Sequence, residues 1–116
     1  MNLYFVELQV REWSVSLQWY REVLRLELLH SDEAARFALL RAGQARLSLK
    51  AGTPQPGGVL LSFEVEALEP WLKRLGSLEV KSSPEGYRRA RLLDPDGYAI
   101  TLFEWLPGVH RPAWAE

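Results

Sequence analysis

The order of periodic segments repeats once along the chain, and this repeat constrains the possible folds more than any other feature of the sequence. Residues 3–10 alternate with the period of a half-buried strand, and residues 13–24 carry apolar side chains three and four positions apart, as an amphipathic helix does. Strand-like stretches complete the first half at residues 26–30, 36–41 and 45–50. The first half therefore predicts a β-α-β-β-β module.

The second half repeats this order after a segment rich in turn residues. Residues 52–58 hold three glycines and two prolines in seven positions, which predicts a connector. A strand at 59–65 is followed by a helix that Pro70 opens and Gly76 ends. Three more strands are expected at residues 78–82, 87–93 and 99–105. We therefore expect one α+β domain, residues 1–116, with two β-α-β-β-β modules (2–51 and 59–106), a connector (52–58) and a tail (107–116).

Composition places the chain among globular proteins and removes several kinds of chemistry. Apolar residues make up 47% and charged residues 25% of the chain, as is typical of such proteins. The formal net charge of -1 lacks the basic excess expected of a nucleic-acid-binding protein. There is no cysteine, no apolar run long enough to span a bilayer and no basic region at the N-terminus. We expect a cytoplasmic protein with neither a nucleic-acid nor a membrane partner.

Two motifs, one in each half, carry a family resemblance. The first is the strand Val-Glu-Leu-Gln-Val at 6–10 followed by Ser-Leu-Gln-Trp-Tyr at 16–20, and the second is Leu-Asp-Pro-Asp-Gly-Tyr-Ala-Ile-Thr-Leu at 93–102. With the module order, they resemble the vicinal-oxygen-chelate superfamily of glyoxalase I, bleomycin resistance proteins and extradiol dioxygenases over residues 2–106. The chain departs from the family pattern at Glu12-Trp13, where Asp-Leu is usual, and at Arg25, where a glycine commonly closes the helix. The resemblance implies that the strands curl around a concave face that holds a ligand.

Alternation assigns side chains to this concave face. Because Val6, Leu8 and Val10 are expected to face the core, the residues between them point the other way. The same reasoning applies to the strands at 45–50, 59–65 and 99–105, and a shift of one residue would invert each set. The candidate ligand-binding residues are Phe5, Glu7, Arg46, Ser48, Leu60, Glu64, Thr101 and Phe103.

The resemblance also permits a test for a metal, because enzymes of this superfamily hold a divalent ion with four side chains, usually His or Glu. Counting along the strands places Phe5, Ser48, Leu60 and Thr101 at those positions. None of them is an imidazole or a carboxylate, and phenyl or aliphatic groups cannot coordinate. The two histidines are expected elsewhere, His30 in a turn and His110 in the tail. We therefore expect no metal and no other cofactor.

The remaining candidates leave several functions open. Glu7 and Glu64 could form an acid/base pair, but ion pairs with Arg46 and Lys50 are the simpler account. Phe5 and Phe103 could stack on a ligand or fill the concave face, while the tryptophans are expected to be core or interface anchors.

The favoured hypothesis is a metal-free protein that binds a small organic molecule, as bleomycin resistance proteins do, without reacting it. The alternatives are a lyase, isomerase or dioxygenase-like enzyme with displaced functional residues, and a dimerisation partner with a filled concave face. A homodimer is expected because the family usually pairs subunits and because large apolar side chains such as Trp13, Trp105 and Trp114 stand at the ends of elements.

Overall fold

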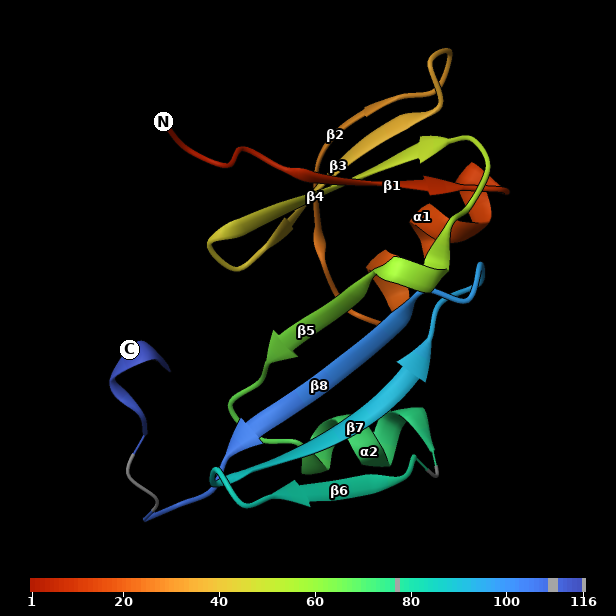
Figure 1. Ribbon diagram of the computed structural model, residues 1–116. Helices are drawn as coiled ribbons and strands as arrows, with labels where there is room; N and C mark the ends of the chain where they lie inside the picture. Colours follow the sequence, from red (N-terminus) through yellow and green to blue (C-terminus); the bar gives the residue numbers. More distant parts are fainter. Residues whose placement is uncertain (77, 109–110, 116) are drawn as a thin grey trace. The chain divides into compact units, whose positions relative to one another are not determined.

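The computed structural model describes residues 1–76, 78–108 and 111–115. The chain divides into two compact units: Met1–Gly58 with Asp94–Gly97, and Val59–Leu93 with Tyr98–Glu116. Each unit contains a four-stranded mixed sheet and an α-helix in the order β-α-β-β-β (Figure 1). The predicted α+β fold with two such modules is therefore confirmed, while the expectation of a single domain stays a prediction.

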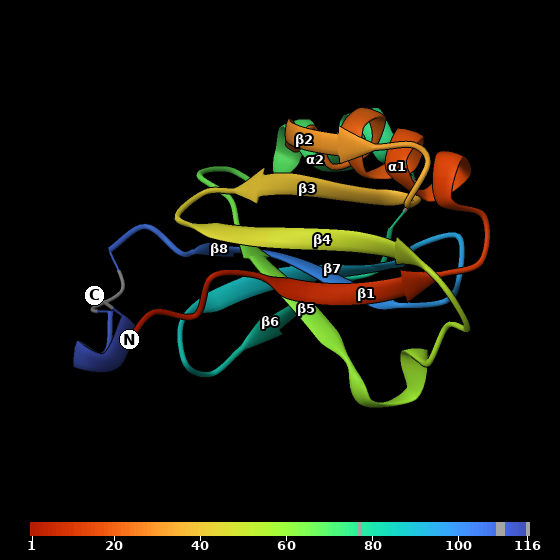
Figure 2. The ribbon, with the colours of Figure 1, turned by 90° about the horizontal axis from the view of Figure 1, so that it is seen from above.

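The first unit is built on strands whose order in the sheet is β1-β4-β3-β2, as Figure 2 shows. Strand β1 runs parallel to β4, and the other neighbours are antiparallel. The connection from β1 to β2 is the helix α1, which begins at Trp13 and ends at Glu22. The strands are β1 (Val6–Val10), β2 (Glu27–Asp32), β3 (Phe37–Ala42) and β4 (Ala45–Ala51).

One face of this first sheet forms the core of the unit. Leu8 on β1 stands beside Leu49 on β4, and both are buried. The face continues across β3 through Ala38 and Leu40, and α1 contributes the fully buried Tyr20. Because successive strand residues point to opposite faces, Glu7 and Ser48 lie on the other side of the sheet, as the alternation predicts.

The second unit repeats the topology with the sheet order β5-β8-β7-β6, in which β5 is parallel to β8. Its helix α2 (Glu69–Leu75) has Pro70 in the first turn, where the missing N–H costs nothing, and is capped by Gly76, which has a φ of 89°. No helix in the described ranges is both long and apolar enough to cross a membrane. The strands are β5 (Leu60–Glu64), β6 (Val80–Ser83), β7 (Tyr87–Leu93) and β8 (Ala99–Trp105).

The turn Asp94–Gly97, which links β7 to β8, belongs to the first unit by its contacts. The Tyr20 hydroxyl donates a buried hydrogen bond of 2.6 Å to Asp94 Oδ2, and Ser16 Oγ donates one of 3.3 Å to Asp96 Oδ2. The backbone N–H of Arg11 donates to the same Asp96 carboxylate at 3.3 Å. The two sequence motifs that carry the family resemblance are therefore hydrogen-bonded to each other.

Candidate ligand-binding site

The predicted site residues of the first unit lie together on the face opposite its core. Glu7 and Ser48 are register partners on β1 and β4, and Ser48 Oγ donates a hydrogen bond of 3.2 Å to Glu7 Oε1. Ser48 is fully buried, so its hydroxyl needs a partner and has one in Glu7. This part of the face satisfies its own polar groups.

Aromatic rings extend the same face. The Phe5 ring lies 6.0 Å from that of Tyr4 and 6.1 Å from that of Phe37, whose ring centroid is 6.3 Å from that of His30. His30 was expected in an exposed turn at the end of its strand; it is exposed, but the turn assignment is wrong, because β2 continues to Asp32 and a register shift after Leu28 pairs His30 with Leu39. His110, the other histidine, lies outside the described residues.

The expected ion pairs between the basic residues and the two glutamates are not formed among the side chains that the structure describes. The Arg46 guanidinium lies 4.5 Å from the centroid of the Tyr4 ring, a cation–π arrangement, and Lys50 Nζ donates to the backbone oxygen of Ala35. Glu64 on β5 pairs instead with Arg111 at 3.1 Å. These charges are compensated by partners that alternation does not reveal.

The second unit carries a pocket on the corresponding face of its sheet. Ser62 and Glu64 on β5 pair with Thr101 and Phe103 on β8, so the predicted residues share one face. A cavity of about 330 Å³ lies over this face and has three of them, Leu60, Thr101 and Phe103, in its wall. We call it the aromatic-walled pocket, and its lining residues are Leu60, Ser62, Glu85, Tyr87, Arg89, Thr101, Phe103, Trp105 and Trp114.

Three rings form the wall that gives this pocket its name. Tyr87, Phe103 and Trp105 contact one another edge to face, with centroid distances of 5.7 to 5.8 Å. Trp114, in the short helix Ala113–Ala115, adds a fourth ring 6.3 Å from that of Trp105. Trp105, expected to be a core or interface anchor, lies in the wall of this cavity, and its role as an anchor stays a prediction. Antiparallel pairing of β7 with β8, which places Tyr87 beside Trp105, is the signal that would have revealed the cluster.

Two polar atoms of the pocket residues are buried without a hydrogen-bond partner among the described residues: the Thr101 hydroxyl oxygen and Trp105 Nε1. Thr101 is 5% exposed, whereas its register neighbour Ser62 is exposed. A buried polar group without a partner costs about 1 to 3 kcal/mol. Two residues of the aromatic wall region therefore carry a polar atom whose burial is not compensated within the described residues.

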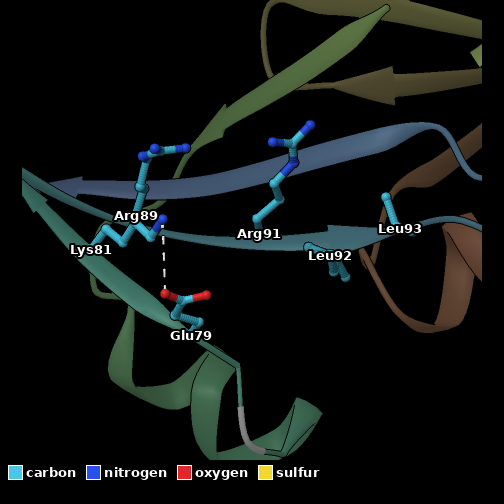
Figure 3. A pocket seen from close by; sticks show the side chains of 6 residues that line it. All are labelled: Glu79, Lys81, Arg89, Arg91, Leu92 and Leu93. Carbon is cyan, nitrogen blue, oxygen red and sulfur yellow. Dashed lines mark ion pairs between the residues drawn. The ribbon is translucent and has the colours of Figure 1, made fainter. Parts of the chain in front are cut away.

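Arg89 connects this pocket with a second cavity of about 390 Å³ further along β7. Figure 3 shows Arg89 and Arg91 extending from β7, with Lys81 and Glu79 joined by an ion pair of 3.8 Å. We call this second cavity the cationic pocket, and its lining residues are Glu79, Lys81, Arg89, Arg91, Leu92 and Leu93.

The opposite face of the second sheet holds a different kind of charged group. Glu104 accepts a hydrogen bond of 2.8 Å from the backbone N–H of Leu68 and also binds the Arg88 guanidinium. The Leu68 hydrogen bond first, and then Arg88, hold the pKa of Glu104 below its ordinary value, against the opposing effect of burial. This cluster ties the start of α2 to β7 and β8, so its role is structural.

The side chains at the four positions that the resemblance would give to a metal do not fit one. Phe5 and Leu60 offer no donor atom, and Ser48 and Thr101 offer only neutral hydroxyls. Within residues 1–76, 78–108 and 111–115, no three His, Asp or Glu side chains gather into a ligand set. In a chain without cysteine, imidazole and carboxylate groups are the usual side-chain ligands of divalent metals, so these four side chains do not form a metal site of that kind.

No family model matches the sequence, and no curated protein matches it. Several solved structures match the fold of this chain. A glyoxalase-related enzyme from Fulvimarina pelagi has a TM-score of 0.74 at 18% identity, over 90% of this chain and 88% of that one. A lactoylglutathione lyase from Agrobacterium tumefaciens has a TM-score of 0.72 at 15% identity, with coverages of 89% and 92%. A glyoxalase/bleomycin resistance protein/dioxygenase family enzyme from Burkholderia phytofirmans PsJN has a TM-score of 0.72 at 18% identity, with coverages of 91% and 100%.

The chain therefore has the fold of the glyoxalase/bleomycin resistance/dioxygenase proteins. The resemblance to the vicinal-oxygen-chelate superfamily, expected from the two motifs and the module order, is confirmed at the level of the fold. The assignment of individual side chains to ligand binding stays a prediction.

Proposed function

We propose that the chain binds a small organic molecule in the aromatic-walled pocket, without a metal and without converting the ligand. The carrying observation is a cavity of about 330 Å³ whose wall holds three rings in mutual edge-to-face contact, Tyr87, Phe103 and Trp105. Small-molecule sites are typically concave, mostly apolar and supplied with a few polar groups that orient the ligand. A cavity of about 330 Å³ lies at the lower end of the range of about 300 to 1,000 Å³ that is usual for small-molecule sites.

The groups in the pocket support binding better than catalysis. A serine or threonine becomes a nucleophile when a base removes its proton, and no histidine is among the residues that line the pocket. Glu85 and Arg89 are its ionisable side chains besides Tyr87, and no other carboxylate among the lining residues could form an acid/base pair with Glu85. The pocket therefore supplies stacking, a hydroxyl and charge, which together recognise a ligand.

A thermal-shift screen with aromatic small molecules tests the proposal, since a ligand at 100 times its Kd adds about 2.7 kcal/mol of stability. Each hit is then titrated against Phe103→Leu and against Phe37→Leu, a matched control because both are half-buried phenylalanines on the non-core face of their sheet. We expect Phe103→Leu to weaken the ligand by about tenfold and Phe37→Leu to leave its affinity unchanged. Equal loss in both variants would contradict this location.

An enzyme of the lyase, isomerase or dioxygenase kind is the rival function, and its metal is the discriminating property. Elemental analysis of the purified protein is expected to find no transition metal in stoichiometric amount. One metal ion per chain would overturn the metal-free proposal. Carboxylates such as Glu7, which accepts a hydrogen bond from Ser48, would then be the candidate metal ligands.

We further propose that the chain acts as a cytoplasmic homodimer without nucleic-acid or membrane partners. Large apolar side chains are exposed, with Leu60 at 57% and Trp114 at 73%, and exposed apolar surface of this kind is often covered by a partner subunit. Sedimentation equilibrium at micromolar concentration is expected to give twice the chain mass of 13.3 kDa. A monomer under these conditions would contradict the dimer.

A further inference from the structure

Strand β7 presents three side chains in a row along the face that holds both pockets of the second unit. Tyr87, Arg89 and Arg91 alternate along the strand, and their register partners on β8 are Trp105, Phe103 and Thr101. Tyr87 and Arg89 line the aromatic-walled pocket, while Arg89 and Arg91 line the cationic pocket. The two cavities therefore share Arg89 and lie along one strip of surface, the β7 strip, which is aromatic at the Tyr87 end and basic at the Arg91 end.

The basic end of the β7 strip carries more positive charge than the carboxylates beside it can neutralise. Among the described side chains, neither Arg89 nor Arg91 has a carboxylate within ion-pair distance, although on the opposite face Arg88 binds Glu104. Two carboxylates near the β7 strip already have partners: Glu79 pairs with Lys81 at 3.8 Å, and Glu64 pairs with Arg111 at 3.1 Å. A third, Glu85, lies in the wall of the aromatic-walled pocket. Three cations and one carboxylate line the cationic pocket.

We infer that the ligand of the aromatic-walled pocket is an aromatic anion, with its ring against Phe103 and its oxyanion held by Arg89 and Arg91. This inference rests on the proposed function, because the ring end uses the same pocket. Residues two apart on a strand lie about 7 Å from each other, so two guanidinium groups can converge on one carboxylate, sulfonate or phosphate. Such planar donor groups suit oxyanions, and an anion relieves the repulsion between them.

Two fluorescent probes that differ by one charged group test the inference. 8-Anilinonaphthalene-1-sulfonate is an aromatic anion, and N-phenyl-1-naphthylamine is the same ring system without the sulfonate. We expect Arg91→Gln to weaken the anionic probe by at least about tenfold and to leave the neutral probe unchanged, because a hydrogen bond to a charged group is lost only with the anion. Raising the salt concentration should weaken the anionic probe alone.

Matched variants separate this effect from changes in net charge and in folding. Lys73→Gln removes one positive charge from an exposed position on α2 and is expected to change the affinity of neither probe. Arg89→Gln repeats the test at the residue that lines both pockets, so the result does not rest on a single variant. Thermal melts check that each variant is folded. Phe103→Leu is expected to weaken both probes, because both place a ring there.

The outcomes distinguish the inference from the function on which it rests. Binding of both probes with equal affinity, or no effect of Arg89→Gln and Arg91→Gln on the anionic probe, would overturn the anion site and leave the aromatic pocket intact. Failure of both probes to bind, or binding that Phe103→Leu does not weaken, would overturn ligand binding in the aromatic-walled pocket itself.

Discussion

The two sheets have the same strand order but differ at the equivalent position of their central strands. Ser48 on β4 and Thr101 on β8 both stand on the central strand that runs parallel to the first strand of the module. Ser48 donates to Glu7 across that strand pair, whereas Thr101 faces Ser62 and has no hydrogen-bond partner among the described residues. At this position the neighbouring strand supplies a carboxylate in one sheet and a short hydroxyl in the other, so one central-strand hydroxyl is hydrogen-bonded and the other has no partner among the described residues.

The aromatic residues follow the same division. In the first unit Phe5, Phe37 and His30 form a chain of ring contacts across the sheet. In the second unit Tyr87, Phe103 and Trp105 contact one another around a cavity. The same backbone topology therefore carries a row of ring contacts across one sheet and a ring cluster around a cavity on the other, and the side chains make the difference.

The largest effects are expected in the two cores, where the units should respond alike. Leu49→Ala and Leu102→Ala each empty a buried position of a central strand and are expected to cost about 2 to 5 kcal/mol of unfolding free energy. If the chain is one domain, urea unfolding followed by circular dichroism shows one transition, which both substitutions shift. Two transitions, each moved by only one variant, would contradict the single domain.

A medium effect is expected at Glu104, which has a depressed pKa. Because its folded pKa lies below the ordinary value of 4.5, the carboxylate contributes stability above that pH and loses it as pH falls through the folded pKa. Glu104→Gln should lower the unfolding free energy at pH 7 by about 1 to 3 kcal/mol and flatten its decline in acid. Urea unfolding from pH 7 to pH 3 checks this, and an unchanged acid slope would refute the role of Glu104.

A smaller pair of effects, opposite in sign, would sharpen the difference between the two hydroxyls. Ser48→Ala removes the donor to Glu7 and should cost about 0.5 to 1.5 kcal/mol. Thr101→Val removes a buried hydroxyl without a described partner and should leave stability equal or raise it by up to about 1 kcal/mol, while weakening any ligand that bonds this group. Thermal melts of both variants measure the two signs, and a matching loss in both would remove the distinction.

The smallest effect concerns the ends of the two helices. After α1, Arg25 has a φ of 60°, and after α2, Gly76 has a φ of 89°. Because a side chain is strained in this left-handed region, Arg25→Gly should relieve strain of about 1 kcal/mol and raise the melting temperature slightly. Gly76→Ala, the reciprocal change, should lower it. A loss of stability in Arg25→Gly would show that the arginine side chain compensates for its backbone.

Sequence periodicity predicted the features that depend on residues close together in the sequence, namely strand bounds and the faces of strands. The strands at 87–93 and 99–105 have the bounds that alternation and the flanking turns predicted. Leu8 and Val10 are buried, as predicted for the core face of β1, whereas Val6, expected on the same face, is 44% exposed. The place of His30 was missed because a register shift in β2 breaks the alternation that would identify its face. The pair Glu64 and Arg111 was missed because no local pattern reports a contact between residues 47 positions apart.

The turn at Asp94–Gly97 makes the first unit discontinuous in sequence, and this has a consequence for how the chain matures. Tyr20 must wait for Asp94, 74 residues later, before its hydroxyl finds its acceptor. During synthesis the N-terminal sheet can form early, but its helix gains this buried hydrogen bond only after residue 94 has been made. A chain that stops at the connector would contain all four strands of the first sheet but not the Asp94–Gly97 turn, so the first unit is complete only once residue 97 has been synthesised.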